Sequence, residues 1–391
     1  MDIAAGNGRE EALFGGKPSS PRPAEASHPG IAPNATIVFV QLRNDPDGFL
    51  GNSRQLLEAV EYVFQKADQL DMPAVVNLSI ATSGGPHDGS TLVEQGFESL
   101  LAEKPGRAIV VSAGNARLQR SHTAGTVTSG QPVNIRWYTD PGKAKNQMEV
   151  WYPGDLGLVV RLRTPDGVTL PQAVRLGETW DLHEDDREGA AWLGRVRHRE
   201  KDPDNGDHQI EICLPHLEGR PWEIELSCEG DSVSFHAWID QEDLGVSRFE
   251  DAVESHTVSS IGCSRNLITV GAFDTSERES LRLPYEAAAI GPTRNNVHKP
   301  DVSAPGVAIV AARAHGGVTV MSGTSMAAAH VTGLTALLFQ LAQRAGRGRL
   351  RIEETRALLS RGNVDAKSSM RSVFDLEKKA LAAQSIGGIG G

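Results

Sequence analysis

The chain has 391 residues, more than most single domains contain, so its length predicts two domains with a large core. Its net charge of -11 argues against a nucleic-acid partner, which would favour a basic surface. No apolar run appears long enough for a membrane span. The N-terminus also lacks the basic and apolar regions of a signal peptide, so the chain as written is expected to be cytoplasmic.

The metal-binding residue types show no recognisable ligand spacing. Cys213, Cys228 and Cys263 are odd in number, which indicates buried thiols in a reducing compartment rather than a disulfide or zinc site. Residues 183–186 and His198 match no known ligand set, so we expect a solvated charged loop there. No metal and no cofactor are expected, and the sequence does not specify an oligomeric state.

The first part of the chain alternates strand and helix patterns after a loop rich in Gly, Pro and Ser at residues 7–33. The strands are apolar throughout, which is typical of a parallel sheet covered by helices on both faces. The predicted fold class is therefore α/β, with a doubly wound parallel sheet. The expected elements are a buried strand at 35–42, a helix at 53–70, a strand at 73–80, a helix at 91–102 and a strand at 108–113.

The pattern changes after Asn115. All six tryptophans fall between residues 137 and 238, apolar residues alternate with polar ones, and turn signals recur. This predicts an antiparallel β-sandwich at 117–255, inserted into an α/β domain made of 1–116 and 256–391. The clustered tryptophans also allow a weaker alternative, a carbohydrate-binding sandwich. Another buried strand within 259–273, a polar helix at 352–360 and a disordered tail beyond Ser385 complete the chain.

Residues 323–333, Gly-Thr-Ser-Met-Ala-Ala-Ala-His-Val-Thr-Gly, place Ser325 between a glycine and strong helix formers, directly after a strand-like run at 317–321. Ser325 should therefore open a helix. The backbone N–H groups at a helix start have no partner within the helix, and the helix dipole there favours negative charge. The hydroxyl and the amide of Ser325 could thus both face a reacting carbonyl. The small residues Ala327, Ala328 and Gly333 should let this helix pack close to the sheet.

Two adjacent blocks, residues 299–306 and 323–328, resemble the serine block of the subtilisin-like proteases (subtilases), although Ala329 stands where the family usually has proline. Residues 109–115 resemble the block that carries the family's oxyanion-hole asparagine. The resemblance implies a serine endopeptidase in which Ser325 is the nucleophile. The Asn115 amide and the Ser325 N–H would then hold the developing oxyanion. Without the serine block, Asn115 would more simply be a residue that turns the chain after Gly114.

The resemblance also implies a peptide-binding surface. Residues 77–81 resemble the segment against which subtilases lay an extended substrate, so Ser79, Ile80 and Ala81 would bind a peptide or protein substrate through main-chain hydrogen bonds. Ala81 stands where glycine is common, which predicts a narrower cleft. Ser112, Ala113 and Gly114 would form a wall of the main pocket. The insertion point and the loop at 85–89 resemble the bacterial Csp-type subset, which carries a jelly-roll insertion.

A serine nucleophile needs a histidine base that is oriented by a carboxylate. Subtilases present these in the order Asp, His, Ser, with the histidine in a His-Gly-Thr block, and neither block is found in this sequence. Residues 1–6 resemble the tail of the histidine helix, so the histidine is expected roughly five residues before Met1 and the aspartate further upstream. His330 lies about 7.5 Å along the helix from Ser325 and is turned about 140° from it, so it cannot reach the hydroxyl.

Other stand-ins for the missing residues are equally unconvincing. His298 and His315 are not expected to act as bases, and Asp274, in a stretch that superficially resembles the aspartate block, is interpreted as part of a turn. Two classes of function follow. One is an endopeptidase that is inactive as written, because its Asp and His are missing. The other is a non-catalytic relative that binds peptides or a partner protein.

Overall fold

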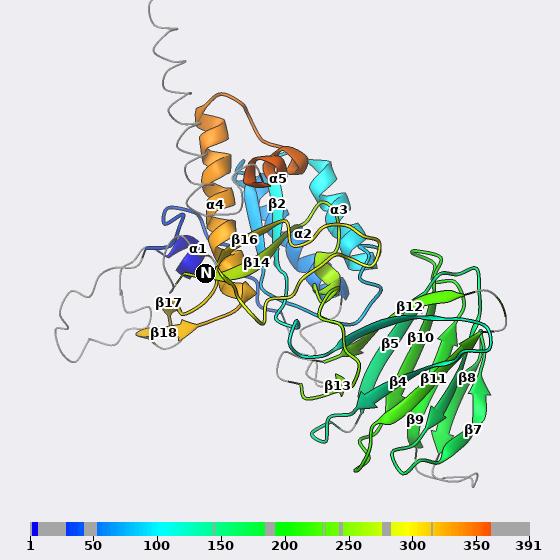
Figure 1. Ribbon diagram of the computed structural model, residues 1–391. Coiled ribbons are helices and arrows are strands. Elements are labelled where there is room, and N and C mark those ends of the chain that lie inside the picture. The colour runs from blue at the N-terminus through cyan, green and yellow to red at the C-terminus, as the bar shows by residue number, and fades with distance from the viewer. Residues whose placement is uncertain are drawn as a thin grey trace, which may run out of the picture.

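The computed structural model describes residues 2–6, 29–42, 53–143, 145–183, 192–228, 230, 232–241, 245–275, 283–313 and 316–360. An α/β part and a part made of antiparallel strands lie side by side (Figure 1). The chain passes from the first to the second after strand β2 and returns before strand β14.

The centre of the α/β part is a parallel sheet with the strand order β1, β2, β14, β16. In its middle, Val270 pairs with Ser112 on one side and with Val302 on the other. All six residues of β2 are buried, as expected for an apolar strand that is covered on both faces. The bounds are β1 Ala74–Leu78, β2 Arg107–Ser112, β14 Ile268–Asp274 and β16 Val302–Pro305, with the antiparallel β15 Leu283–Pro284 beside the end of β14.

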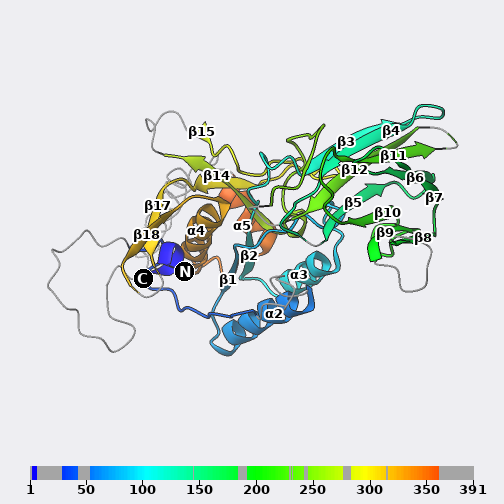
Figure 2. The ribbon, with the colours of Figure 1, turned by 90° about the horizontal axis from the view of Figure 1, so that it is seen from below.

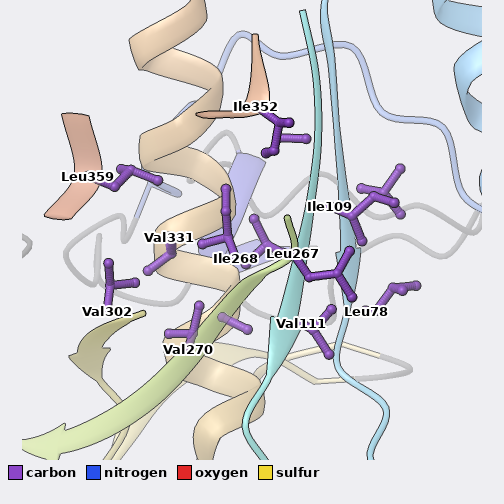
Figure 3. Close-up of a cluster of buried hydrophobic side chains, with 14 of the residues drawn as sticks. Leu78, Ile109, Val111, Leu267, Ile268, Val270, Val302, Val331, Ile352 and Leu359 are labelled. Atoms are coloured by element: carbon purple, nitrogen blue, oxygen red, sulfur yellow. The ribbon is translucent and has the colours of Figure 1, made fainter. Parts of the chain in front are cut away.

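Helices cover both faces of this sheet. Helix α4 packs on all four parallel strands, and α2 and α3 lie on the opposite side of β1 and β2 (Figure 2). Val331 of α4 meets Ile268 and Val270 of β14 in the core (Figure 3). The α/β class is thereby confirmed, and three predicted helices are found within two residues of their expected bounds. The helices are α1 Asp2–Ala5, α2 Ser53–Gln69, α3 Leu92–Glu103, α4 Thr324–Arg344 and α5 Ile352–Ser360.

The buried strand expected at residues 35–42 is wrong. The segment forms no strand, and Ile37 and Phe39 are 51% and 66% exposed. In the part of the chain that the structure describes, no strand pairs with it, and β1 stands at the edge of the sheet. The apolar side chains of 35–42 are not buried on a sheet face, because this backbone does not hydrogen-bond to a neighbouring strand among the described residues. The apolar pattern alone was therefore not enough to predict a strand.

Helix α4 corrects another expectation from the sequence. Among the described residues it is the one helix whose length and mean hydropathy, 1.3 over 18 residues, match those of a membrane span. Yet 61% of that stretch is buried inside the protein, where α4 packs on the sheet. Its apolar character therefore has an explanation in the core packing.

The second part contains two antiparallel sheets that share one hydrophobic core. Strand β11 shows the alternation, since every second residue from Trp222 to Cys228 is buried. One sheet has the order β3, β12, β5, β10, β9, β8 and the other β13, β4, β11, β6, β7. The strands are β3 His122–Val127, β4 Val133–Tyr138, β5 Asn146–Tyr152, β6 Leu158–Arg163, β7 Thr169–Val174, β8 Thr179–His183, β9 Trp192–Arg199, β10 His208–Leu214, β11 Trp222–Cys228, β12 Val233–Asp240 and β13 Arg248–Phe249.

Four of the tryptophans are buried, and Trp137 and Trp222 belong to this core. Trp137, Trp151, Trp222 and Trp238 are buried, and each indole N–H donates to a protein oxygen. A carbohydrate platform would need exposed rings, so for these four the alternative is wrong. His198 is also buried instead of solvated, because its ring lies against the hydroxyl of Tyr152 inside the core.

Contacts between the two parts centre on the loop at residues 85–89. The ring of His87 stacks on Trp238 with centroids 4.2 Å apart. Asp88 accepts hydrogen bonds from Asn205 at 3.1 Å and from Arg294 at 2.6 Å, and Arg294 also pairs with Asp207 at 2.6 Å. The loop thus attaches the antiparallel sheets to the α/β part through stacking and a largely buried ion-pair network.

Candidate active site

The first turn of α4 carries Ser325. Strand β18 (Val318–Met321) pairs with β17 (Ile309–Ala312), and Gly323 then turns the chain into the helix, which begins at Thr324. Gly323 has a φ of 149°, in the region that favours glycine, and a Cβ there would lie 3.4 Å from Nδ2 of Asn115. Ser325 is the second residue of the helix and is half-buried, so the sequence-based placement of this serine is confirmed.

Asn115 lies just beyond the carboxyl end of β2 and contacts the same helix end. Its Oδ1 accepts from the backbone N–H of Thr324 at 3.1 Å and from the Thr324 hydroxyl at 3.3 Å. The hydroxyl of Thr324 in turn accepts from the backbone N–H of Gly114 at 3.1 Å. These bonds orient the amide: its oxygen faces the helix start, and its nitrogen is the end that can donate. Asn115 is therefore more than a residue that turns the chain.

Ser79 connects the end of β1 with the serine turn. Its hydroxyl donates to the carbonyl oxygen of Ser325 at 3.2 Å and accepts from Nδ2 of Asn77 at 3.0 Å. Oδ1 of Asn77 accepts from the hydroxyl of Thr332 at 2.9 Å. Thr332 lies about two helical turns beyond Ser325 on the same face of α4. Ser79 and Ala81 are exposed and Ile80 is half-buried, so this segment is open to a peptide.

The segment Ser112, Ala113, Gly114 is buried instead. The N–H of Ala113 donates to Val270, and its carbonyl accepts from Ser259 at 2.8 Å. The carbonyl of Gly114 accepts from Ala289 at 2.9 Å. The main-chain groups named here are therefore already hydrogen-bonded within the fold and are not available to a substrate.

No described histidine hydrogen-bonds to the hydroxyl of Ser325. Nδ1 of His330 lies 2.9 Å from the carbonyl oxygen of Met326 in its own helix, and burial lowers the pKa of this ring. His298 is exposed, and His315 lies outside the described residues. Asp274 corrects a prediction, because it ends strand β14 and pairs with Leu283 instead of forming a turn. A two-residue partner strand was too short to recognise in the sequence.

The family is decided by comparison with known proteins. The model of the peptidase S8 or subtilase family matches residues 3–154 and 245–372, well over half of the chain. The chain belongs to the subtilase family. The subtilase is 30% identical over 166 residues to the serine protease AprX of Bacillus subtilis (strain 168), an alignment that covers 34% of this chain and 37% of that protein. It thus spans little more than a third of that curated relative.

A solved structure supports the same fold. The CspB protease of Clostridium perfringens superposes with a TM-score of 0.72 at 21% identity, over 85% of this chain and 74% of that one. The chain is accordingly a subtilisin-like α/β protein of the subtilase family.

Sequence reasoning missed one residue of the site, Thr324. Its hydroxyl connects Gly114 with Asn115, and its backbone N–H is the donor that holds the Asn115 amide. The available signal was its place before the serine at the start of a helix, where unpaired N–H groups need acceptors.

Proposed function

We propose that this subtilase provides the nucleophile and the oxyanion hole of a serine endopeptidase, with Ser325 attacking a peptide carbonyl. The observation that carries the proposal is the attachment of Asn115 to the helix turn that bears Ser325, through two hydrogen bonds from Thr324. The Asn115 amide and the Ser325 N–H would both donate to the oxyanion.

Acyl transfer then requires proton movement. When Oγ of Ser325 bonds to the carbonyl carbon, its proton must pass to a base and later to the leaving amine as the C–N bond breaks; water afterwards releases the acyl group. We propose that an aspartate and a histidine outside this 391-residue sequence complete the triad. The chain without them is expected to be inactive.

For the substrate we propose an extended peptide beside the segment Ser79, Ile80, Ala81, with Ser112, Ala113 and Gly114 as a wall of the main pocket. We further propose that residues 117–255 are an inserted, jelly-roll-like domain of the Csp type. Support comes from their separate core and from the family match, which leaves residues 155–244 unmatched.

The alternative is a non-catalytic relative that binds peptides at the same place. It is favoured by the lack of a histidine partner for Ser325 among the described residues, while the open segment at 79–81 remains available. The hydrogen bonds that hold Asn115 against the turn of Ser325 favour the peptidase, because a binding module does not need an oxyanion donor.

Fluorophosphonate labelling tests the proposal. In subtilisin, loss of the histidine alone lowers turnover by about 10⁶-fold, so the given chain should label only at a trace rate. A longer form with an aspartate block and a His-Gly-Thr block ahead of Met1 should label at Ser325, and Ser325→Ala should abolish this. Strong labelling of the given chain would contradict the proposed need for an external base.

Two further variants test the oxyanion hole in the longer form. Asn115→Asp keeps the Oδ1 acceptor for Thr324 but loses the donor, so peptide hydrolysis should fall by about 10²–10³-fold while the fold persists. Ser322→Ala, which removes an exposed hydroxyl on the same turn, is the control and should have little effect. Peptide binding without labelling in the longer form would favour the alternative function.

A further inference from the structure

Three histidines that are far apart in the sequence meet where the antiparallel sheets join the α/β part. His122 begins β3, His236 lies in β12, and His256 lies in the segment that returns to the α/β part. The ring centroid of His122 lies 5.3 Å from that of His236 and 5.4 Å from that of His256. The centroids of His236 and His256 are 4.8 Å apart. One nitrogen of each ring lies within 4.8 Å of the other two.

The outer nitrogens of two rings already have oxygen partners. Nδ1 of His122 lies 3.3 Å from the carbonyl oxygen of Val253, which leaves Nε2 as the ligand nitrogen, 3.0 Å from Nδ1 of His236. Nδ1 of His256 lies 2.9 Å from the hydroxyl of Ser255, which leaves its Nε2. Metal-binding histidines characteristically have such an oxygen on the second nitrogen, because it sets the tautomer and the ring orientation.

The cluster is partly open to solvent. His122 is buried, while His236 and His256 are half-buried, so water can reach the open side of the cluster.

The geometry is close to that of a bound zinc ion. With Zn–N bonds of about 2.0–2.1 Å, tetrahedral ligand nitrogens lie roughly 3.4 Å apart. The His122 and His236 nitrogens, 3.0 Å apart, are near this separation, and the ligand nitrogen of His256 lies within 4.8 Å of both, so its side chain would move toward them when an ion binds. The backbone of His256 is held in the left-handed region with a φ of 60°, and its carbonyl accepts from the indole of Trp238 at 2.8 Å.

We propose that His122, His236 and His256 form a binding site for a divalent transition-metal ion of the zinc class, with water as the fourth ligand. Three imidazoles without a carboxylate suit zinc, cobalt, nickel or copper rather than calcium or magnesium. On binding, His236 moves its proton from Nδ1 to Nε2 through solvent, so the charge of the ligands does not change. The ion would join β3, β12 and the returning segment, and so stabilise the junction.

Zinc titration of the tag-free protein, after chelator treatment, tests this site. Calorimetry should show one Zn²⁺ per chain, and the melting temperature should rise with Zn²⁺ and fall again with chelator. Cobalt should give the intense visible absorption of a tetrahedral ion. Loss of a residue that hydrogen-bonds to a metal ligand typically lowers metal affinity by about 10–100-fold. Loss of a ligand itself should cost more, so His236→Asn and His256→Asn should each weaken Zn²⁺ binding by more than about 100-fold.

The variants are chosen to keep the fold. Asparagine tolerates the left-handed conformation that His256 adopts, so His256→Asn preserves the backbone. His298→Asn, which changes an exposed histidine elsewhere, is the matched control and should bind like the wild type. The proposal is overturned if the wild type fails to bind Zn²⁺, or if both cluster variants bind it as strongly as the control does.

Discussion

At the scale of single residues, a buried cation in the block at 299–306 depends on one carboxylate. The side chain of Lys299 is fully buried, and its ammonium donates to Oδ2 of Asp301 at 2.7 Å and to the carbonyl of Leu267 at 2.9 Å. Oδ2 also accepts from the N–H of Thr269, and Oδ1 accepts from Arg356 at 2.5 Å. This pair of residues in the block thus has a structural role.

Asp301→Ala should therefore destabilise the protein by about 3–5 kcal/mol, because Lys299 would remain buried without a counter-charge. Denaturant unfolding measures this. The double variant Lys299→Met with Asp301→Asn removes the stranded charge and keeps an acceptor for Thr269, so it should recover part of the loss. A loss below about 1 kcal/mol for Asp301→Ala would show that the ammonium finds water or another partner.

Glu94 gives a pH dependence of known sign. It lies buried in α3, where Oε1 accepts from the N–H groups of Cys263 and Ser264 and Oε2 accepts from the hydroxyl of the N-cap Thr91. Burial raises its pKa from 4.5 to about 7. Between these values the unfolded chain has lost the proton and the folded protein keeps it, so stability falls as the pH rises through this window.

Glu94→Gln should remove this dependence, which amounts to at most about 3 kcal/mol between the two limits. Its Oε1 can still accept from Cys263 and Ser264, and its Nε2 can donate to Thr91, so the network is preserved. The free energy of unfolding, measured across the window for both proteins, should slope less in the variant. Parallel slopes would mean that Glu94 is ionised in the folded protein.

At the scale of elements, one of the three small residues of α4, Gly333, packs against a different partner from the one expected. Ala327 and Ala328 are fully buried against the sheet, but a Cβ on Gly333 would lie 2.6 Å from Cβ of Ile31 and 2.7 Å from the carbonyl oxygen of Ala4. Gly333 therefore permits close packing of α1 and the chain at 30–32, not of the sheet. Hydrogen bonds between α1 and Ile31 and Ala32 keep that backbone in place.

Gly333→Ala should destabilise the protein by about 1–3 kcal/mol, although alanine favours the helix, because the obstructing atoms are backbone or close to it. Gly96→Ala in α3 is the matched control. There the three atoms nearest to a Cβ all belong to the side chain of Leu57, with its two methyl groups at 2.7 and 2.8 Å and its Cγ at 3.3 Å, and this side chain can rotate away. Thermal unfolding of both variants checks the contrast, and equal losses would refute the assignment of Gly333 to the α1 contact.

At the scale of the whole molecule, the two ends of the antiparallel part lie together. The N–H of Val253 donates to the carbonyl of His122 at 2.8 Å, and Arg117 pairs with Glu254 at 3.0 Å. The α/β part keeps its own core without any residue between 117 and 255. A chain that lacks those residues can thus be rejoined without distorting the parallel sheet.

Deletion of residues 117–255 with a short Gly-Ser linker should leave a helix-rich protein that unfolds cooperatively, as followed by circular dichroism. It should be less stable than the full chain, since the stack of His87 on Trp238 and the pair of Arg294 with Asp207 are lost. All six tryptophans lie in the deleted part, so in the full chain their fluorescence reports that part alone. Loss of cooperative unfolding in the deletion variant would show that the two cores depend on each other.

Local patterns in the sequence were sufficient for much of this protein. The helical periodicity at 53–70, the serine after glycine at a helix start, and the motif that resembles a subtilase all depend on neighbouring residues, and the structure and the family match agree with them. Such features follow from backbone propensity, capping and short-range side-chain chemistry, which do not depend on residues that are distant in the sequence.

Tertiary structure decided what depends on distant partners. Residues 35–42 have the composition of a buried strand but no ladder among the described residues, and the orientation of Asn115 depends on Thr324, 209 residues away. His122, His236 and His256 converge only because β3 pairs with β12 and the chain returns beside them. A burial state or a ligand set is a property of neighbours in space, and sequence spacing carries no information about neighbours that only folding brings together.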